Sequence, residues 1–402
     1  MKLYNHIAYK MCDHEAEIAK HIKPGGNWKD IPLSIADARL NSIRKSGGRT
    51  TYYGRLTWDA PSYTIATYFN RVPNGCNLHP EQNRVMSVRE AARFQSFPDD
   101  FIFKGKQSSI YKQIGNAVPP LLARYISTLI KPYLQSYNFV DLFAGCGGLS
   151  EGFLMNGFNL LAANELDKNI FLTNQFNHSK YADESRFILG DVTQDDTKRR
   201  IYDACAGQQV DIILGGPPCQ GFSYAGWRDP DDKRNQLFRD FVSVVLQLKP
   251  YFFVMENVPG MLTMRGGEAI KEIIQAFADV GYYVNQPLRL NSADYGVPQR
   301  RRRVFLIGCR DNDVIEPHPL FEDPKSKKKA PSPLCDASAL PHYIITREAI
   351  GSLPKIEDGG GENEMSWSVI NPTDYDLLMQ RDITFDEFYD RKLRANNEKE
   401  SI

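Results

Sequence analysis

Short apolar runs alternate with amphipathic stretches through the middle of the chain. From Asn138 to about Arg310 the apolar runs end in turns carrying Gly, Pro, Asn or Asp, and helical stretches separate them. This alternation predicts a doubly wound α/β sheet. The expected strands are Phe139–Phe143, Leu160–Asn164, Phe187–Leu189, Val210–Leu214, Phe252–Met255 and Arg303–Ile307. Because open α/β sheets bind ligands beside the carboxyl ends of their strands, we expect a site there.

The segments on either side of this region have a different pattern. Residues 1–83 are irregular, and residues 311–402 are polar and end in a charged tail that we expect to fray. Between them and the sheet, residues 87–97 predict a helix that begins with a Ser87/Glu90 capping box, and Pro119–Ile130 predicts another. The flanks therefore indicate a second, smaller and irregular domain.

Composition adds limits rather than a function. The 402 residues include 42% hydrophobic and 24% charged side chains, which is enough for two domains. The apolar runs are far shorter than the roughly 20 residues of a membrane helix, and the N-terminus lacks a signal-peptide core, so the cytoplasm is the expected compartment. Seven scattered cysteines without a CxxC pair argue against a disulfide framework or a zinc site, and we expect no metal.

The charge is balanced overall but not along the chain. Lys+Arg and Asp+Glu both total 49, whereas Lys2 to Arg55 contains ten basic and five acidic residues. Further basic runs lie at Arg300–Arg303 and Lys325–Lys329. Such runs are more often solvated surface than a binding site, so by themselves they identify no partner.

A glycine-rich turn follows the first expected strand. The segment FVDLFAGCGGLSEG, which starts at Phe139, runs from a strand through Gly145 and Gly147 into a helix, and its backbone can approach a nucleotide closely. Glu165 ends the next strand about twenty residues later, where a carboxylate can hold ribose hydroxyls. Asp191 follows the third strand and can accept from an adenine amino group. These residues predict a nucleoside pocket, which suits a nicotinamide cofactor or S-adenosylmethionine equally.

One cysteine follows a rigid turn. In DIILGGPPCQGFS, a strand leads into Pro217-Pro218 and then Cys219, and a segment rich in Gly and aromatic residues comes next. A lone cysteine is usually a buried thiol. Prolines directly before it and glycine soon after fix the backbone at a point of exposure, which favours Cys219 as a nucleophile.

Charged side chains end the next two segments. Glu256 closes the strand FVME, and an isolated glutamate there is usually solvated or capping, but its place in the row with Glu165, Asp191 and Cys219 favours a proton-donor role. Gln299 is followed by Arg300–Arg303. Strand alternation would place Arg301 and Arg303 on one face, so that one pair enters the site while the other meets phosphates.

Together these segments resemble the DNA (cytosine-5) methyltransferase family. The shared segments are DLFAGCGGLS, NELD at Asn164, Gly190-Asp191, GGPPCQ at Gly215, Glu256-Asn257-Val258 and Gln299 to Arg303. The resemblance implies an S-adenosylmethionine-dependent fold and transfer of a methyl group to C5 of a flipped-out cytosine, with Cys219, Glu256, Arg303 and Arg301 as catalytic residues. It implies cofactor contacts by Phe143, Gly145, Gly147, Glu165, Leu166, Asp191, Val192, Pro218, Leu237 and Asn116. Leu166 departs from the aromatic residue often found there.

The order of the segments is unusual. The family's last two segments resemble GRLTWDAPSYTI at Gly54 and QIGNAVPP at Gln113, yet here they precede the others. The sequence therefore resembles a circularly permuted member whose ends lie inside the target-recognition region. On this basis we predict a target-recognition domain from 1–85 and 331–402, a hinge at 86–112 and a catalytic domain at 113–330.

Several alternatives remain at this stage. Transfer RNA is the substrate in one branch of the resembling family, although its recognition region is reduced. A nicotinamide-dependent oxidoreductase leaves the Pro-Pro-Cys-Gln segment unused, and a catalytically silent DNA-binding protein leaves Cys219, Glu256 and Arg303 unexplained. The resemblance favours double-stranded DNA, a monomer without a membrane partner, a bacterial or archaeal cytoplasm with association to the nucleoid, and a cognate restriction endonuclease as genetic partner.

Overall fold

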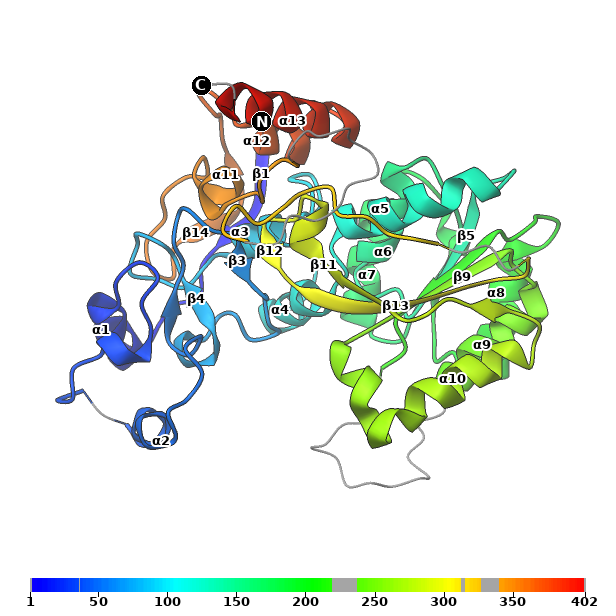
Figure 1. Cartoon of the computed structure of the whole chain (residues 1–402), viewed down its shortest axis with the longest axis horizontal. Helices are drawn as coiled ribbons and strands as arrows, with labels where there is room; N and C mark the ends of the chain where they lie inside the picture. Colours follow the sequence, from blue (N-terminus) through cyan, green and yellow to red (C-terminus); the bar gives the residue numbers. More distant parts are fainter. Residues whose placement is uncertain (1, 36, 219–236, 312–314, 327–339, 401–402) are drawn as a thin grey trace. The chain divides into compact units, whose positions relative to one another are not determined.

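The computed structural model describes residues 2–35, 37–218, 237–311, 315–326 and 340–400 (Figure 1). The chain divides into two compact units. Unit 1 consists of Met1–Asn116, Ala293–Arg301 and Pro319–Ile402, and unit 2 consists of Ala117–Ser292 and Arg302–His318. Each unit is therefore assembled from segments that are distant in the sequence.

Unit 2 contains an eight-stranded sheet. Five neighbouring strands are parallel, in the order β9, β8, β5, β6 and β7. β13 continues the sheet antiparallel to β9, and β10 and β11 both pair with β13. The bounds are β5 Asn138–Leu142, β6 Asn159–Glu165, β7 Phe187–Leu189, β8 Ile212–Gly215, β9 Phe252–Asn257, β10 Tyr283–Val284, β11 Leu288–Asn291 and β13 Arg302–Cys309. The doubly wound sheet and its six predicted strands are confirmed, while β10 and β11 were not predicted.

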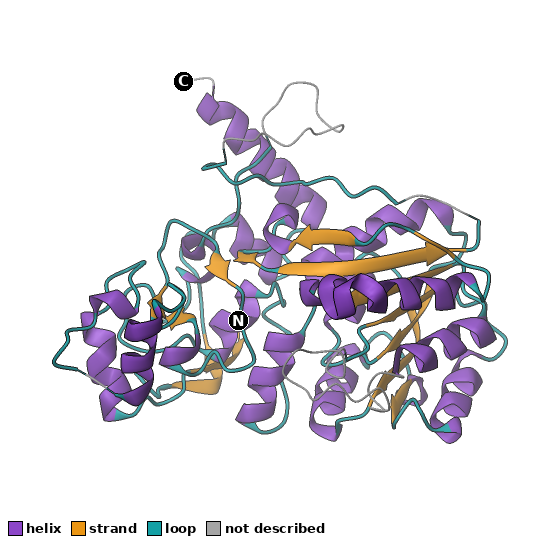
Figure 2. Ribbon diagram, turned by 60° about the horizontal axis from the view of Figure 1, so that its bottom comes forward, coloured by secondary structure: helices purple, strands orange, loops and turns teal. Residues whose placement is uncertain are grey.

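Helices cover both faces of this sheet (Figures 1 and 2). One group consists of α5 Pro120–Ile130, α6 Gly148–Met155 and α7 Lys168–His178, and the other of α8 Asp195–Cys205, α9 Leu237–Leu248 and α10 Glu268–Ala278. Alternate side chains of β5 pack against the helices on opposite faces of the sheet. Val140 and Leu142 join the core formed with α9 and α10, whereas Phe139 contacts Phe153 of α6. The predicted helix over Pro119–Ile130 is confirmed as α5.

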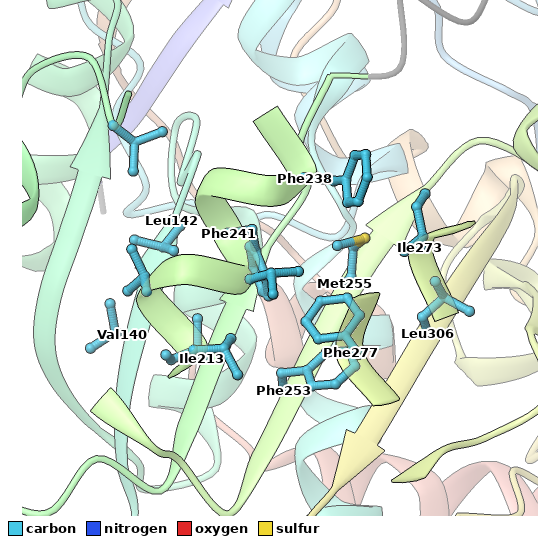
Figure 3. Packing of buried hydrophobic residues seen from close by; sticks show 14 of the residues in the cluster. Val140, Leu142, Ile213, Phe238, Phe241, Phe253, Met255, Ile273, Phe277 and Leu306 are labelled. Atoms are coloured by element: carbon cyan, nitrogen blue, oxygen red, sulfur yellow. The ribbon is translucent and has the colours of Figure 1, made fainter. Parts of the chain in front are cut away.

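Phenylalanine rings pack among aliphatic side chains in the core beneath α9 and α10 (Figure 3). The rings of Phe253 on β9 and Phe277 on α10 stack with centroids 3.7 Å apart, and Phe241 of α9 packs edge-on against both. Such pairs add about 0.5–1.5 kcal/mol each beyond the burial of their apolar area. This packing fixes β9, which carries Glu256, against the helices behind it.

Unit 1 has only two-stranded sheets among its described residues. β1 Lys2–Ile7 pairs with β14 Gly361–Ser366, β2 Gly54–Arg55 with β4 Cys76–Leu78, and β3 Ser62–Tyr63 with β12 Gln299–Arg300. Its α-helices are α1 Asp13–His21, α2 Ala38–Ser46, α3 Val88–Phe94, α4 Gln107–Asn116, α11 Thr346–Ile350, α12 Asp374–Met379 and α13 Phe385–Glu400. The 3₁₀ helices of the chain are η1 Trp28–Asp30, η2 Val72–Asn74, η3 Lys131–Tyr133, η4 Glu184–Arg186, η7 Pro259–Gly267 and η8 Ser292–Tyr295.

Buried ion pairs hold unit 1 together. The Arg93 guanidinium donates to Asp99 and to Asp376, both at 2.7 Å, and all three side chains are almost fully enclosed. This joins α3 to α12 across a long stretch of sequence. The capping box predicted for α3 is present, since Ser87 Oγ accepts from the Glu90 N–H and Glu90 accepts from the Ser87 N–H.

The boundaries of the two units differ from those of the predicted domains. Residues 86–112, predicted as a hinge, lie within unit 1 and include α3, which is buried on all sides. Ala293–Arg301 and the segment from Pro319 also belong to unit 1 rather than to the catalytic part.

The tail that was expected to fray forms α13, because Phe385 and Phe388 are buried. No helix in the described ranges is long and apolar enough to cross a membrane.

Candidate active site

The carboxyl ends of the parallel strands carry most of the predicted site residues. Since β5, β6, β7, β8 and β9 run in the same direction, their ends meet at one edge of the sheet. The glycine-rich loop follows β5, Glu165 ends β6, Asp191 follows β7, the Pro-Pro turn follows β8 and Glu256 lies near the end of β9. The fold thus brings these residues, which span more than a hundred positions, to one edge.

The loop after β5 adopts left-handed backbone conformations. Phe143, Gly145 and Gly147 have φ angles of 55°, 59° and 94°. A Cβ added at Gly145 would meet nothing within 4 Å, so this part of the loop faces open space. The loop therefore leaves room for a ligand to approach its backbone.

Glu165 is held by the backbone around it. Its Oε1 accepts from the N–H groups of Leu166 and Asp167 at 2.8 Å, and Oε2 accepts from the Gly145 N–H at 2.9 Å. Burial raises the pKa of this carboxyl above its usual value, and the three donors oppose that effect. A carboxylate offers about four acceptor positions, so Oε2 can still accept from a hydroxyl. Leu166 itself is 66% exposed.

The remaining predicted cofactor residues occupy different environments. Asp191 is half-buried and its Oδ1 accepts from the Thr193 N–H at 3.0 Å, whereas the Val192 side chain belongs to the hydrophobic core. Val192 can therefore offer a ligand only its backbone. Leu237 is half-buried at the start of α9, and Pro218 is exposed. Asn116 is exposed at the end of α4 and belongs to unit 1.

The Pro-Pro turn is anchored by the neighbouring strand. The Asn257 Nδ2 donates to the Pro217 carbonyl at 3.1 Å, and its Oδ1 accepts from the Val258 N–H at 2.8 Å. The sequence analysis assigned no role to Asn257, although its position directly after Glu256 places it at the same end of the strand as the site residues. Cys219 and the segment rich in Gly and aromatic residues that follows it lie outside the described residues. The turn after β8 is thus held at Pro217, two residues before the predicted nucleophile.

Glu256 and Arg303 form an ion pair between neighbouring strands. The Arg303 Nε lies 2.8 Å from Glu256 Oε1, and each side chain is 12% exposed. In the register of β9 and β13, Glu256 is opposite Phe305, so Arg303 reaches it diagonally. A Cβ at Gly216 would lie 3.1 Å from Glu256 Oε2, so the glycine leaves space for this carboxylate beside the end of β8.

Arg301 occupies a different environment. Its guanidinium is fully buried in unit 1 and donates to the carbonyls of Ile65 and Gly115 at 3.0 and 2.6 Å. The alternation predicted through Arg300–Arg303 is wrong, because β12 ends at Arg300 and β13 begins at Arg302, with Arg301 between them. Arg301 joins two segments of unit 1, and its contact with the base stays a prediction.

Comparison with known proteins places the chain in a family. A model of the family described as C-5 cytosine-specific DNA methylase matches residues 2–131 and 137–392. The chain belongs to this family. The match includes residues of both units, so both are parts of a C-5 cytosine-specific DNA methylase, and the resemblance drawn from the sequence is confirmed.

Curated relatives match over shorter stretches. The Type II methyltransferase M.XorII from Xanthomonas oryzae pv. oryzae is 45% identical over 181 residues, which are 45% of this chain and 42% of the relative. M.DdeI from Desulfomicrobium norvegicum is 40% identical over 253 residues, 61% of this chain and 55% of the relative. M.AgeI from Thalassovita gelatinovora is 35% identical over 253 residues, 61% and 58% of the two chains. The chain spans about half the length of the curated relatives it matches.

Proposed function

We propose that this chain transfers a methyl group from S-adenosylmethionine to C5 of a flipped-out cytosine in a specific double-stranded DNA sequence. The observation that carries the proposal is the Glu256–Arg303 ion pair beside the turn that leads to Cys219, in a chain of the C-5 cytosine-specific DNA methylase family. Transfer RNA is the alternative substrate. No observation on the described residues favours it.

The loop after β5 and the ends of β6 and β7 fit a nucleoside cofactor. Gly145 leaves open space beside its backbone, Glu165 keeps an acceptor position on Oε2, and Asp191 can accept from an adenine amino group. Phe143, Pro218, Leu237 and Asn116 are further proposed contacts, Gly147 and Val192 through their backbones, and Leu166 through its exposed side chain. S-adenosylmethionine supplies an electrophilic methyl group on a sulfonium centre.

Cys219 is the proposed nucleophile. Cytosine C5 is a poor nucleophile, but when the thiolate of Cys219 adds to C6, electron density moves to C5 as an enamine. A C5–CH₃ bond then forms as the sulfonium–methyl bond breaks. Loss of the C5 proton to a base and elimination of the Cys219 thiolate restore the aromatic ring as 5-methylcytosine.

Glu256 and Arg303 are the proposed partners of the base. A glutamate can contact N3 and the exocyclic amine as the ring gains electrons, and an arginine can donate to O2. Their mutual ion pair pre-orients both side chains before the base enters. The cytosine must leave the stacked duplex first, at a cost of a few kcal/mol.

The proposed biological role is the modification enzyme of a restriction-modification system. The named relatives M.XorII, M.DdeI and M.AgeI are Type II methyltransferases, which supports this assignment. We propose further that the chain acts as a monomer on DNA in a bacterial or archaeal cytoplasm, with a cognate endonuclease as genetic partner only.

The substrate assignment can be tested directly. The protein is incubated with tritiated S-adenosylmethionine and either duplex DNA or transfer RNA, and the labelled product is mapped by bisulfite sequencing. We expect label in duplex DNA at one cytosine of a short repeated sequence. Label in RNA but not in DNA would overturn the substrate assignment.

The covalent step has a separate test. Cys219→Ala is expected to reduce methyl transfer to background while leaving the dissociation constant for S-adenosylmethionine within about twofold, because alanine removes only the nucleophile. Calorimetric titration measures the binding. Appreciable turnover by Cys219→Ala would rule out the adduct.

We also propose that the chain is a circularly permuted member of the family. The family match is interrupted at 132–136, between α5 and β5, where this chain passes from the segments that resemble the family's last ones to those that resemble its first. The first and last parts of the chain lie in the same unit, and β1 pairs with β14 there. Both observations support new ends within the target-recognition region.

A further inference from the structure

A chain of hydrogen bonds, buried at one end and partly buried at the loop, lies behind the glycine-rich loop. The Asn174 Nδ2 of α7 donates to the Gly145 carbonyl at 3.4 Å, and Asn174 Oδ1 lies 2.7 Å from His178 Nδ1. His178 Nε2 lies 3.1 Å from Glu151 Oε2 on α6. Both His178 and Glu151 are fully enclosed, with no exposed side-chain surface. Side chains of two helices thus connect to one carbonyl of the loop.

The imidazole also forms the surface against which the loop packs. A Cβ at Gly147 would lie 2.3 Å from His178 Cε1 and 2.9 Å from Nδ1, so only glycine fits there. At Gly145 an added Cβ meets nothing within 4 Å. The loop is therefore backed by His178 on one side and open on the other, which is the side available to a ligand.

The direction of the hydrogen bonds follows from the contact at Gly145. Because Asn174 donates to a carbonyl through Nδ2, its Oδ1 must accept, and His178 Nδ1 must donate. Nε2 then either donates to the Glu151 carboxylate or accepts from its protonated form. In both cases one proton lies between His178 and Glu151, away from solvent. Burying such polar groups lowers the stability of the folded state unless each group keeps its hydrogen-bond partner.

The same loop residue continues the chain to the proposed cofactor site. Gly145 accepts from Asn174 through its carbonyl and donates through its N–H to Glu165 Oε2. Glu165 is the proposed ribose ligand. The position of its carboxylate is thus linked through Gly145 to the helices behind the loop.

We infer that Asn174 is a positioning residue for cofactor binding, held in place by the His178–Glu151 pair. It fixes the Gly145 carbonyl, and with it the N–H that holds Glu165, without touching the ligand. This inference rests on the proposed function, because it assumes that the loop binds S-adenosylmethionine.

The test compares two asparagines on one helix. Asn174 and Asn177 are both buried on α7, but the Asn177 Nδ2 donates to the Thr173 carbonyl within the helix, whereas Asn174 reaches the loop. Asn174→Ala is expected to weaken S-adenosylmethionine binding roughly tenfold, about the effect of one lost hydrogen bond. Asn177→Ala is expected to stay within about twofold. Calorimetric titration measures the dissociation constants, and thermal unfolding without ligand measures stability.

Two substitutions of His178 separate positioning from packing. His178→Asn places an amide near the Nδ1 position and can still donate to Asn174 Oδ1, while His178→Gln reaches toward Glu151 and loses the Asn174 contact. Both remove the ring and should lower the unfolding temperature by similar amounts. We expect His178→Gln to weaken cofactor binding several-fold more than His178→Asn, with kcat at saturating cofactor unchanged within about twofold.

The possible outcomes distinguish this inference from the proposed function. If the wild-type protein binds no S-adenosylmethionine, the proposed function fails. If it binds, but Asn174→Ala and His178→Gln bind as tightly as Asn177→Ala and His178→Asn, the positioning role is wrong. The positioning role is also wrong if the loss of cofactor affinity is proportional to the loss of thermal stability in all four variants.

Discussion

Burial acts on two carboxyl groups near the glycine-rich loop, Asp141 and Glu165. Asp141 in β5 is fully enclosed, its Oδ2 accepts from Ser150 Oγ at 2.6 Å, and its Oδ1 has no partner among the described residues. Burial raises the pKa of Asp141 to about 7. Three backbone donors oppose the same effect at Glu165. Burial thus raises the pKa of both carboxyl groups, and hydrogen-bond donors oppose the rise at each.

Asp141 should make stability depend on pH. Its native pKa of about 7 exceeds the ordinary value of 3.8, so the native state binds this proton more tightly and ionisation opposes folding. The free energy of unfolding should fall between about pH 4 and pH 7. The side chain of Asp141→Asn cannot ionise. As the pH rises from 4.5 to 8, the unfolding free energy of the wild type should therefore fall relative to that of the variant by on the order of 3 kcal/mol.

Urea denaturation of both proteins at pH 4.5 and pH 8 measures this difference. Asn can keep the contact with Ser150 Oγ, so the comparison isolates the charge. If the unfolding free energies of variant and wild type differ by the same amount at both pH values, the pKa of Asp141 is not raised in the folded protein.

Glu256→Gln tests the ion pair at the end of β9. Glutamine has the same size but no charge, so it loses the pairing with Arg303 and the proposed stabilisation of the ring. Methyl transfer to DNA should fall by roughly 10²-fold or more, with cofactor affinity unchanged. Glu272→Gln is the matched control, since Glu272 pairs with Arg239 and Arg265 at the surface of unit 2. Single-turnover methylation rates should separate the two variants.

Sequence patterns predicted some site residues and not others. Glu165 and Glu256 lie at or near the ends of strands whose apolar character is strong, so their shared edge follows from the fold class. Arg301 could not be placed, because its burial depends on carbonyls of Ile65 and Gly115 that are far away in the sequence. The same holds for His178, whose contacts with Glu151 and the loop arise only when α6 and α7 pack.

At the scale of elements, strong local patterns were sufficient and weak ones were not. The six predicted strands and α3 with its capping box were found because each combines an apolar pattern with clear end signals. β10 has two residues and β11 alternates with polar side chains at the edge of the sheet, so neither stands out. α13 is mostly charged, and its stabilising contacts, such as the burial of Phe385 and Phe388 and the Lys392–Glu348 ion pair, arise only when it packs against other segments.

Arg93 of α3 should contribute strongly to the stability of unit 1. Arg93→Met leaves Asp99 and Asp376 buried without their cation, and breaking such a pair costs about 3–5 kcal/mol. Arg391→Met removes an exposed partner of Asp374, 3.4 Å away, and should cost less than about 1 kcal/mol. Chemical denaturation followed by circular dichroism compares the two. Equal midpoints for both variants would mean that the inner network contributes little.

At the scale of the whole molecule, neither unit is a continuous segment. Unit 1 uses both ends of the chain, and β1 joins β14 through registered pairs from Lys2–Ser366 to Ile7–Gly361. In unit 2, the strand β13 follows Ala293–Arg301 in the sequence, and that intervening segment belongs to unit 1. Native contacts, rather than chain order, therefore define both units, and a change in chain order that preserves those contacts should preserve the fold.

A reordered chain tests this argument together with the proposed permutation. Joining Ile402 to Met1 by a flexible Gly/Ser linker and opening the chain at Gln135, which is exposed between η3 and β5, restores the order in which the glycine-rich segment comes first. This protein should fold and methylate DNA at the same sequence, with kcat/KM within about tenfold of the original. A control chain opened inside β5, between Val140 and Asp141, should not fold, because it divides a central strand that pairs on both sides. If the chain opened at Gln135 also fails while the linker is long enough to leave β1 and β14 paired, the family order and the present order are not equivalent, and the permutation proposal is wrong.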